Sequence, residues 1–208
     1  MRRKDQRRRR EQLVAAARAV LLDRGALGLR VKDVAERAGM APSSVLYYYP
    51  DLADLLFEVT REAMHRYGER RAEAIRELAD PAAQLRLAIQ LGVPTGPGDE
   101  ESRLLYELDA LTGTSQVFAT LSAGFFDRQA ALYERVLERG AESGAFTLTA
   151  DAETLGRGLV ALEDGLGLQV VLGHPGIDGA AAEAILVAWA GAATGADLAA
   201  VEPAAAAA

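Results

Sequence analysis

The sequence predicts an all-α protein in two parts, with a small three-helix domain at the amino terminus and a larger helical domain behind it. Alanine, leucine, glutamate and arginine are abundant in the 208 residues, and all four are strong helix formers. Valine-rich stretches of alternating apolar and polar residues are absent, so no strand is predicted. No apolar run reaches the roughly 20 residues that span a bilayer, and the basic start lacks the features of a signal peptide. We therefore expect a cytoplasmic protein.

Charge is distributed unevenly along the chain. Residues 1–50 hold 12 Lys and Arg against 5 Asp and Glu, whereas residues 51–208 hold 11 against 25. The formal net charge of −7 therefore conceals a basic head and an acidic body. This division predicts that only the head approaches a polyanion, although the same charges could simply lie on solvated faces.

The head contains three predicted helices. The first covers about residues 8–24, where apolar side chains recur at helical intervals. A short second helix covers about residues 31–38, and Gly39 can adopt the left-handed conformation of a tight turn. Pro42 suits the first turn of a third helix over about residues 42–48, because its missing N–H is not needed there.

The body is predicted as longer helices separated by turn signals at residues 80–81, 92–98 and 173–176. Helices are expected from Leu52 to about Arg71 and at about 101–111, 116–140, 150–172 and 179–194. The predicted domains are residues 1–51, residues 52–200 and a disordered tail, residues 201–208.

Residues 29–56 are the most informative segment, because two short helices joined by a turn at Gly39 define a helix-turn-helix. Small residues are needed where the two helices cross, and Ala35 and Ala38 supply them. Val45 supplies an apolar anchor on the inner face of the second helix of the pair. Small polar side chains at the exposed start of that helix could meet the edges of DNA bases, and its free N–H groups suit phosphate.

This segment resembles the DNA-binding region of the TetR family of bacterial repressors. The residues that match the family pattern without a gap are Val31, Asp33, Val34, Ala35, Ala38, Gly39, Met40, Ser44, Val45, Tyr48, Tyr49, Pro50 and Leu55. The aromatic-rich exit Tyr47-Tyr48-Tyr49-Pro50, at this distance from the amino terminus, makes the resemblance specific. The rest of the chain is similar to the family only in the length and order of its helices.

Four positions depart from the pattern, namely Arg30 for Thr, Ala41 for Ser, Leu46 for Tyr and Leu52 for Lys. The missing Lys is a phosphate contact in the family, so phosphate binding must rely on other groups. Arg30, Lys32 and an arm with seven Lys and Arg in the first ten residues are the obvious substitutes. The arm could follow the DNA backbone, enter the minor groove or remain a solvated, disordered tail.

Carried over residue by residue, the resemblance implies a DNA-facing set of Arg30, Lys32, Pro42, Ser43, Ser44, Tyr47 and Tyr48. Lys32 could donate to guanine and Ser43 could pair with several bases, whereas Ser44 and Tyr48 would hold phosphates. Tyr49 occupies an apolar position of the family, so we interpret it as a core residue.

The resemblance also implies a homodimer held by the last two helices, because one domain reads only one half-site of a near-palindromic operator. The sequence offers a leucine stripe and several small residues for this interface, and these are Leu155, Leu159, Leu162, Leu166, Val170, Ala184, Val187, Ala188 and Gly191. The same stripes could instead build the core of a single chain.

A pocket for a small-molecule effector is expected among the middle helices. Its candidate lining residues are Met64, Tyr67, Leu105, Tyr106, Phe118, Phe125, Phe126, Tyr133 and Gln169. Core packing is the alternative role for each of them. Glu163 and Asp164 lie inside an apolar helix, where they could meet a cationic effector, cap the interface or face solvent. We interpret His65 and His174 as structural or surface residues.

The expected function is that of a ligand-responsive regulator, in which effector binding weakens DNA binding through the helix that begins at Leu52. An enzyme is not expected, because the sequence has no cysteine, no glycine-rich phosphate loop and no cluster with metal-ligand spacing. It also has only two histidines for acid-base chemistry. No cofactor or metal is predicted. The alternatives are a helical binding or interaction module whose head has lost DNA affinity, and an activator in place of a repressor.

Overall fold

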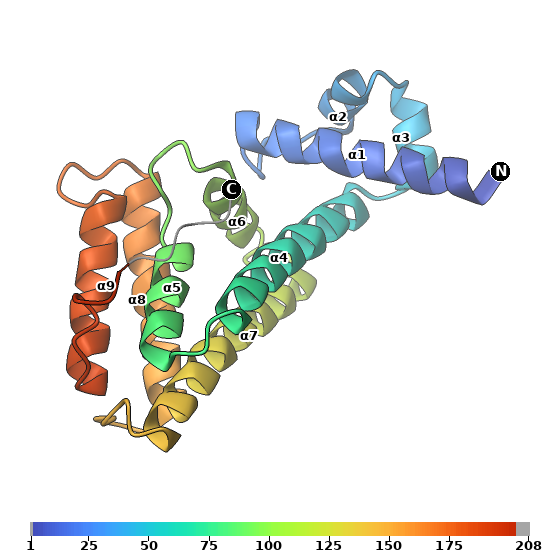
Figure 1. The fold of residues 1–208 in the computed structure, drawn as a ribbon. Coiled ribbons are helices and arrows are strands. Elements are labelled where there is room, and N and C mark those ends of the chain that lie inside the picture. The colour runs from blue at the N-terminus through green and yellow to red at the C-terminus, as the bar shows by residue number, and fades with distance from the viewer. Residues whose placement is uncertain (1, 203–208) are drawn as a thin grey trace. The chain divides into compact units, whose positions relative to one another are not determined.

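The structure is a computed structural model that describes residues 2–202, with only the backbone of residues 2–4. This described part of the chain contains nine helices and no strand, so the all-α prediction is confirmed (Figure 1). Val201 and Glu202 belong to no helix, and the rest of the predicted tail lies outside the described residues. The helices are α1 (Arg2–Arg24), α2 (Val31–Ala38), α3 (Pro42–Tyr48), α4 (Leu52–Arg76), α5 (Pro81–Gly92), α6 (Glu100–Asp109), α7 (Gln116–Glu142), α8 (Ala152–Val171) and α9 (Gly179–Thr194).

Helix α1 begins at Arg2, several residues before the predicted start at about residue 8. Asp5 lies in its first turn, where a carboxylate favours the positive end of the helix dipole. The Arg7 Nε donates to the Glu11 Oε1 at 2.8 Å, one helical turn away. The arginine run therefore continues a helix from Arg2, which differs from the disordered tail that was one of the expected alternatives.

Packing divides the described residues into two compact units, each with its own apolar core. Unit 1 contains the residues up to Arg66 together with 103–122, and unit 2 contains 67–102 together with the residues from Ala123 onward. The division therefore does not coincide with the domain boundary predicted after Asp51. The physical reason is that the first half of α4 buries its apolar face against the head, through residues such as Leu55 and Val59.

The core of unit 1 is built on one face of α1. Leu13, Ala17 and Leu21 are fully buried there, and they pack with Val34 of α2 and Val45 of α3. Leucines of α6 complete this core from a distant part of the sequence. The three-helix head is therefore stabilised by chain segments that follow it.

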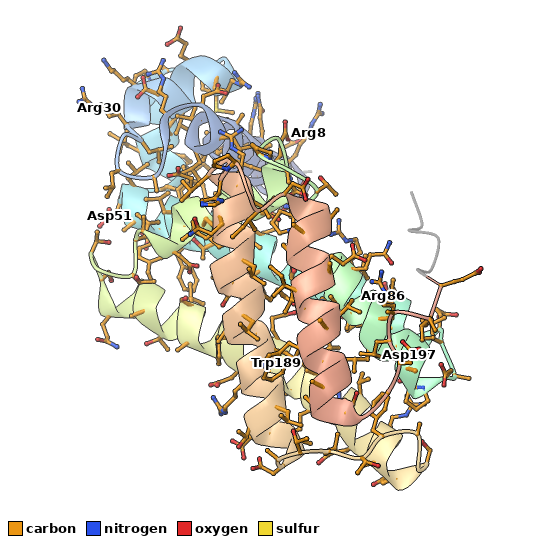
Figure 2. All side chains as sticks on the ribbon, turned by 90° about the vertical axis from the view of Figure 1, so that its left-hand side faces the viewer. Arg8, Arg30, Asp51, Arg86, Trp189 and Asp197 are labelled. Atoms are coloured by element: carbon orange, nitrogen blue, oxygen red, sulfur yellow. The ribbon has the colours of Figure 1, made fainter. Side chains whose placement is uncertain are left out.

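The core of unit 2 joins α5, α7, α8 and α9. Ala182, Leu186 and Ala190 of α9 are completely buried, and Glu183 of the same helix pairs with Arg86 of α5. Figure 2 shows α8 and α9 side by side with Trp189 between them, and a Cβ at Gly158 of α8 would lie 3.1 Å from the Trp189 ring. Among the described residues, no helix is both long and apolar enough to cross a membrane.

Candidate functional sites

The turn between α2 and α3 has the geometry of a helix-turn-helix. Gly39 ends α2 in the left-handed region at φ 65° and ψ 37°. The Met40 N–H donates to the Ala35 carbonyl at 2.9 Å, and the Gly39 N–H donates to the Glu36 carbonyl at 3.1 Å. These two bonds satisfy the last carbonyls of α2 and set the direction in which α3 starts at Pro42.

Replacing Gly39 with alanine is expected to destabilise unit 1 by about 1–2 kcal/mol, the cost of a Cβ in the left-handed conformation. The space around Gly39 is open, so backbone strain is the whole effect. Urea denaturation followed by circular dichroism would measure it. Gly113→Ala is the matched control, because that glycine also has open space but no positive φ. Equal stabilities of the two variants would rule out this explanation of the turn.

The inner face of α3 is anchored in the core. Val45 is 1% exposed and Tyr49 is 3% exposed, as predicted for both residues. The Tyr49 hydroxyl donates to the Glu58 carboxylate of α4, and the Arg10 guanidinium lies 5.0 Å from the centre of the Tyr49 ring. Burial, followed by Glu58, raises the pKa of Tyr49 well above its ordinary value, so the phenol remains a neutral donor.

The outer face of the helix pair is open to solvent. Of the predicted DNA-facing residues, five are exposed and two, Ser44 and Tyr48, are half-buried. The exposed members are Arg30, Lys32, Pro42, Ser43 and Tyr47, and Figure 2 marks Arg30 on unit 1. The Tyr47 side chain is 69% exposed and meets the Tyr48 ring edge-on, with 5.1 Å between the ring centres.

The contacts of Arg10 were not predicted from the sequence. Its Nη2 donates to the Tyr48 carbonyl at the end of α3 at 3.3 Å, and its Nη1 lies 3.7 Å from a Glu58 oxygen. A cation at the carboxyl end of a helix is favourable for the helix dipole. The basic amino-terminal turns of α1 are therefore attached to α3 at Arg10.

A buried polar cluster lies within unit 2, centred on Arg71 of α4. The Arg71 side chain is 1% exposed, and its two Nη atoms donate to the two carboxylate oxygens of Glu163 at 2.8 and 2.6 Å. They also donate to the Ala88 carbonyl at 2.7 Å, the Gln129 Oε1 at 2.9 Å and the Tyr133 hydroxyl at 2.8 Å. One guanidinium thereby joins α4, α5, α7 and α8.

The electrostatics of this cluster keep the Arg71 guanidinium charged. Burial, the largest single influence, lowers the pKa of Arg71, but the Glu163 carboxylate together with the Tyr133 and Tyr67 side chains outweighs it, so that pKa lies well above its ordinary value. Burial, followed by Glu163, raises the pKa of Tyr133, whose hydroxyl donates to Glu163 at 2.6 Å. Gly92 is required beside the pair, because a Cβ there would overlap the Glu163 carboxylate.

The predicted pocket residues are divided between the two units. Tyr67 and Tyr133 contact Arg71, and Phe125 meets the Tyr67 ring edge-on at 5.8 Å. Phe126 packs against the core of unit 2, and Gln169 is half-buried. The other four belong to unit 1 and are Met64, Leu105, Tyr106 and Phe118. Leu105 and Phe118 pack in the core of that unit, so core packing is the observed role for these two.

Glu163 was expected to meet a cationic effector, cap the interface or face solvent, but it is buried and pairs with Arg71 of the same chain. Asp164 is exposed. The sequence signal that could have identified Arg71 is weak, because an arginine on a helix normally faces solvent.

His65 and His174 are exposed, and the described residues contain no group of three or more acidic or histidine side chains that could hold a metal.

The residues predicted for the dimer interface differ in their burial. Leu155, Leu159, Val170 and Val187 are buried in the core of unit 2, because their stripes face the neighbouring helices of the same chain. Leu162, Leu166 and Gly191 are half-buried, and Ala184 and Ala188 are exposed. The exposed small and apolar residues of the two helices are Ala161, Gly165, Leu168, Ala180, Ala184, Ile185, Ala188 and Ala192, and Leu172 directly after α8 is also exposed.

Two family descriptions match the chain. Residues 13–59, which include the helix-turn-helix, match the family described as "Bacterial regulatory proteins, tetR family". The description "BetI-type transcriptional repressor, C-terminal" matches residues 81–195, more than half of the chain. Together they cover parts of both units.

Individual proteins are similar over different lengths. The fatty acid metabolism regulator protein of Bacillus subtilis (strain 168) is 28% identical over 98 residues, which are 47% of this chain and 50% of that protein. The chain thus matches about half the length of that curated relative.

Two solved structures share the fold. A transcriptional regulator from Saccharomonospora viridis in complex with choline is 24% identical, with a TM-score of 0.82 over 89% of this chain and 96% of that one. A TetR-family regulator from Rhodococcus sp. is 21% identical, with a TM-score of 0.77 over 89% and 98%. The chain therefore belongs to the TetR family of transcriptional regulators, which are DNA-binding transcription factors and not enzymes.

Proposed function

We propose that the chain is a ligand-responsive repressor, which binds a near-palindromic operator as a homodimer in the cytoplasm and is released by a small-molecule effector. The observation that carries this proposal is the form of the helix-turn-helix. Its inner face is anchored by the buried Val45, while Ser43 and Tyr47 on the outer face are exposed. A short helix held in this way can place polar side chains in the major groove.

The DNA contacts divide by chemistry. Ser43 and Lys32 read base edges, whereas Ser44 and Tyr48 hold phosphates. Arg30 and the basic first turns of α1 supply the positive charge that Leu52 does not. Because α1 is helical from Arg2 and attached to α3 at Arg10, these turns follow the duplex backbone as a rigid element.

The proposed homodimer is supported by the surface of α9. Every exposed residue of this helix is an alanine or isoleucine, and Ile185 is 45% exposed. Leu168 of α8 and Leu172, directly after that helix, are further exposed apolar residues, with exposures of 38% and 69%. A contiguous exposed apolar face marks an interaction surface, and a self-complementary pair of helices suits a twofold homodimer.

We propose that the effector binds in unit 2, where the Arg71 cluster joins four helices. Helix α4 contributes residues to both units, since it runs from Leu52 to Arg76 and the units divide at Arg66. A ligand that moved α4 would therefore change unit 1 as well. By thermodynamic reciprocity, operator DNA must then weaken ligand binding by the same factor.

Binding of the purified protein to fragments of its own upstream DNA over a range of salt concentrations tests the proposal. Selective, saturable binding that weakens as salt rises is expected. Arg30→Ala, which removes a proposed phosphate-binding cation, should weaken the binding and flatten the plot of log affinity against log salt by about 1 unit of slope. Arg139→Ala, at an exposed position of unit 2, is the control and should leave that slope unchanged.

Absence of selective binding at low salt would rule out the operator hypothesis. Leu52, which stands half-buried at the start of α4 where a phosphate-binding cation is expected, would then favour a helical interaction module. If binding is observed, the position of the bound site relative to the promoter distinguishes repression from activation.

A further inference from the structure

The surroundings of Arg71 are those that proteins build for an organic cation. Its guanidinium carbon lies 5.0 Å from the centre of the Tyr133 ring and 5.9 Å from that of the Tyr67 ring. The Glu163 carboxylate supplies the opposite charge at 2.6 Å. Aromatic faces combined with a carboxylate are the arrangement that recognises ammonium and quaternary ammonium groups.

In this chain the Arg71 guanidinium occupies the cation position between these rings and Glu163. Both oxygens of Glu163 accept from the guanidinium, so this carboxylate is already paired with a cation. The Gln129 Oε1 and the Ala88 carbonyl also accept from it, and they are polar atoms that need a donor when buried. Of the Arg71 nitrogens, the Nε alone is buried without a hydrogen-bond partner.

A quaternary ammonium ion could not take over these bonds. Its nitrogen has no N–H group, so the Gln129 and Ala88 oxygens would lose their donors. Displacement would also leave the Arg71 charge without Glu163 inside the core, which is a large cost. The guanidinium, with its five planar donors, matches the convergent acceptors better than any alkylammonium does.

We propose that Arg71 is an internal occupant of a cation site formed by Tyr67, Tyr133 and Glu163, and that it determines effector specificity by excluding quaternary ammonium ions such as choline. The role in effector specificity rests on the proposed function. The exclusion of quaternary ammonium ions depends only on the side chains around Arg71 in unit 2. The regulator from Saccharomonospora viridis has the same fold and holds choline. Similar folds can bind different ligands because the side chains of the site decide the ligand.

Thermal unfolding of the full-length protein in choline tests the proposal. Choline is not expected to raise the unfolding midpoint of the wild type. In Arg71→Met, choline can supply the positive charge that Glu163 has lost, so the midpoint should rise by about 5 °C at saturating choline. The uncharged isostere dimethylbutanol should have no such effect on the variant.

The double variant Arg71→Met/Glu163→Gln is the matched control. It has the same vacated space but no carboxylate, so choline should not shift its midpoint. An equal choline shift in the wild type and Arg71→Met would overturn the proposal, as would a folded Arg71→Met that choline does not stabilise.

If Arg71→Met does not fold, the wild type and Arg71→Lys keep the proposal testable. Both retain a cation beside Glu163 and are expected to show no choline shift, and a shift in either would overturn the exclusion. Operator binding by the same wild-type preparation without ligand is measured separately. A failure of the repressor function therefore appears in the DNA assay, and a failure of the specificity argument appears in the unfolding midpoints.

Discussion

Arg71→Met is expected to lower the free energy of unfolding by about 3–5 kcal/mol, because it leaves the Glu163 carboxylate buried without a countercharge. Methionine replaces the aliphatic part of the arginine side chain but has no donor, so the space of the guanidinium is vacated and its hydrogen bonds are not replaced. The bonds to Gln129 and Ala88 would be lost together with the ion pair. This is the largest stability effect that we expect from a single substitution in unit 2.

Urea denaturation followed by circular dichroism and by the fluorescence of Trp189, the one tryptophan of the chain, would measure this loss. Arg70→Met is the matched control, because Arg70 is 58% exposed and forms a surface pair with Glu101 at 2.6 Å. Its loss should change the free energy of unfolding by no more than about 1 kcal/mol. Adding Glu163→Gln to Arg71→Met should recover part of the stability, because it removes the unpaired charge. Equal effects of the Arg70 and Arg71 variants would contradict this account of the buried cluster.

Ala188→Arg is expected to convert a homodimer into a monomer and to weaken operator binding about 10²-fold or more. Ala188 is exposed in the middle of the apolar face of α9, so the substitution does not disturb the core of unit 2. In a twofold interface the same position occurs in both copies, and two arginines would be brought together. Loss of the pairing leaves each chain with one half-site, which removes the gain from simultaneous binding.

Sedimentation or light scattering would measure the mass of the variant, and the DNA assay would measure its affinity. Ala141→Arg is the control, since Ala141 is an exposed alanine at the end of α7 and lies outside that apolar face. It should remain a dimer with unchanged operator affinity. If Ala188→Arg keeps the wild-type mass, the copies must associate through another face.

Most helices, and the turn that positions α3, could be predicted from local rules. Gly39 and Pro42 have the roles expected of them, because the conformations that glycine and proline allow are properties of the residues themselves. The anchoring of Val45 and Tyr49 was predicted from the motif and is observed. The start of α1 was not, because a run of arginines resembles a disordered tail until the pair of Arg7 with Glu11 is seen.

Local sequence is enough to predict the helical class, the helix-turn-helix and its apolar anchors, since each depends on residues that are close in the chain. The tertiary structure alone decided which apolar stripe of α8 is buried, and that Glu163 pairs with a residue 92 positions away. An amphipathic pattern shows that a face will be covered, but it does not identify the partner that covers it. The same limit applies to a charge within a helix, because its countercharge depends on which helices the fold brings together.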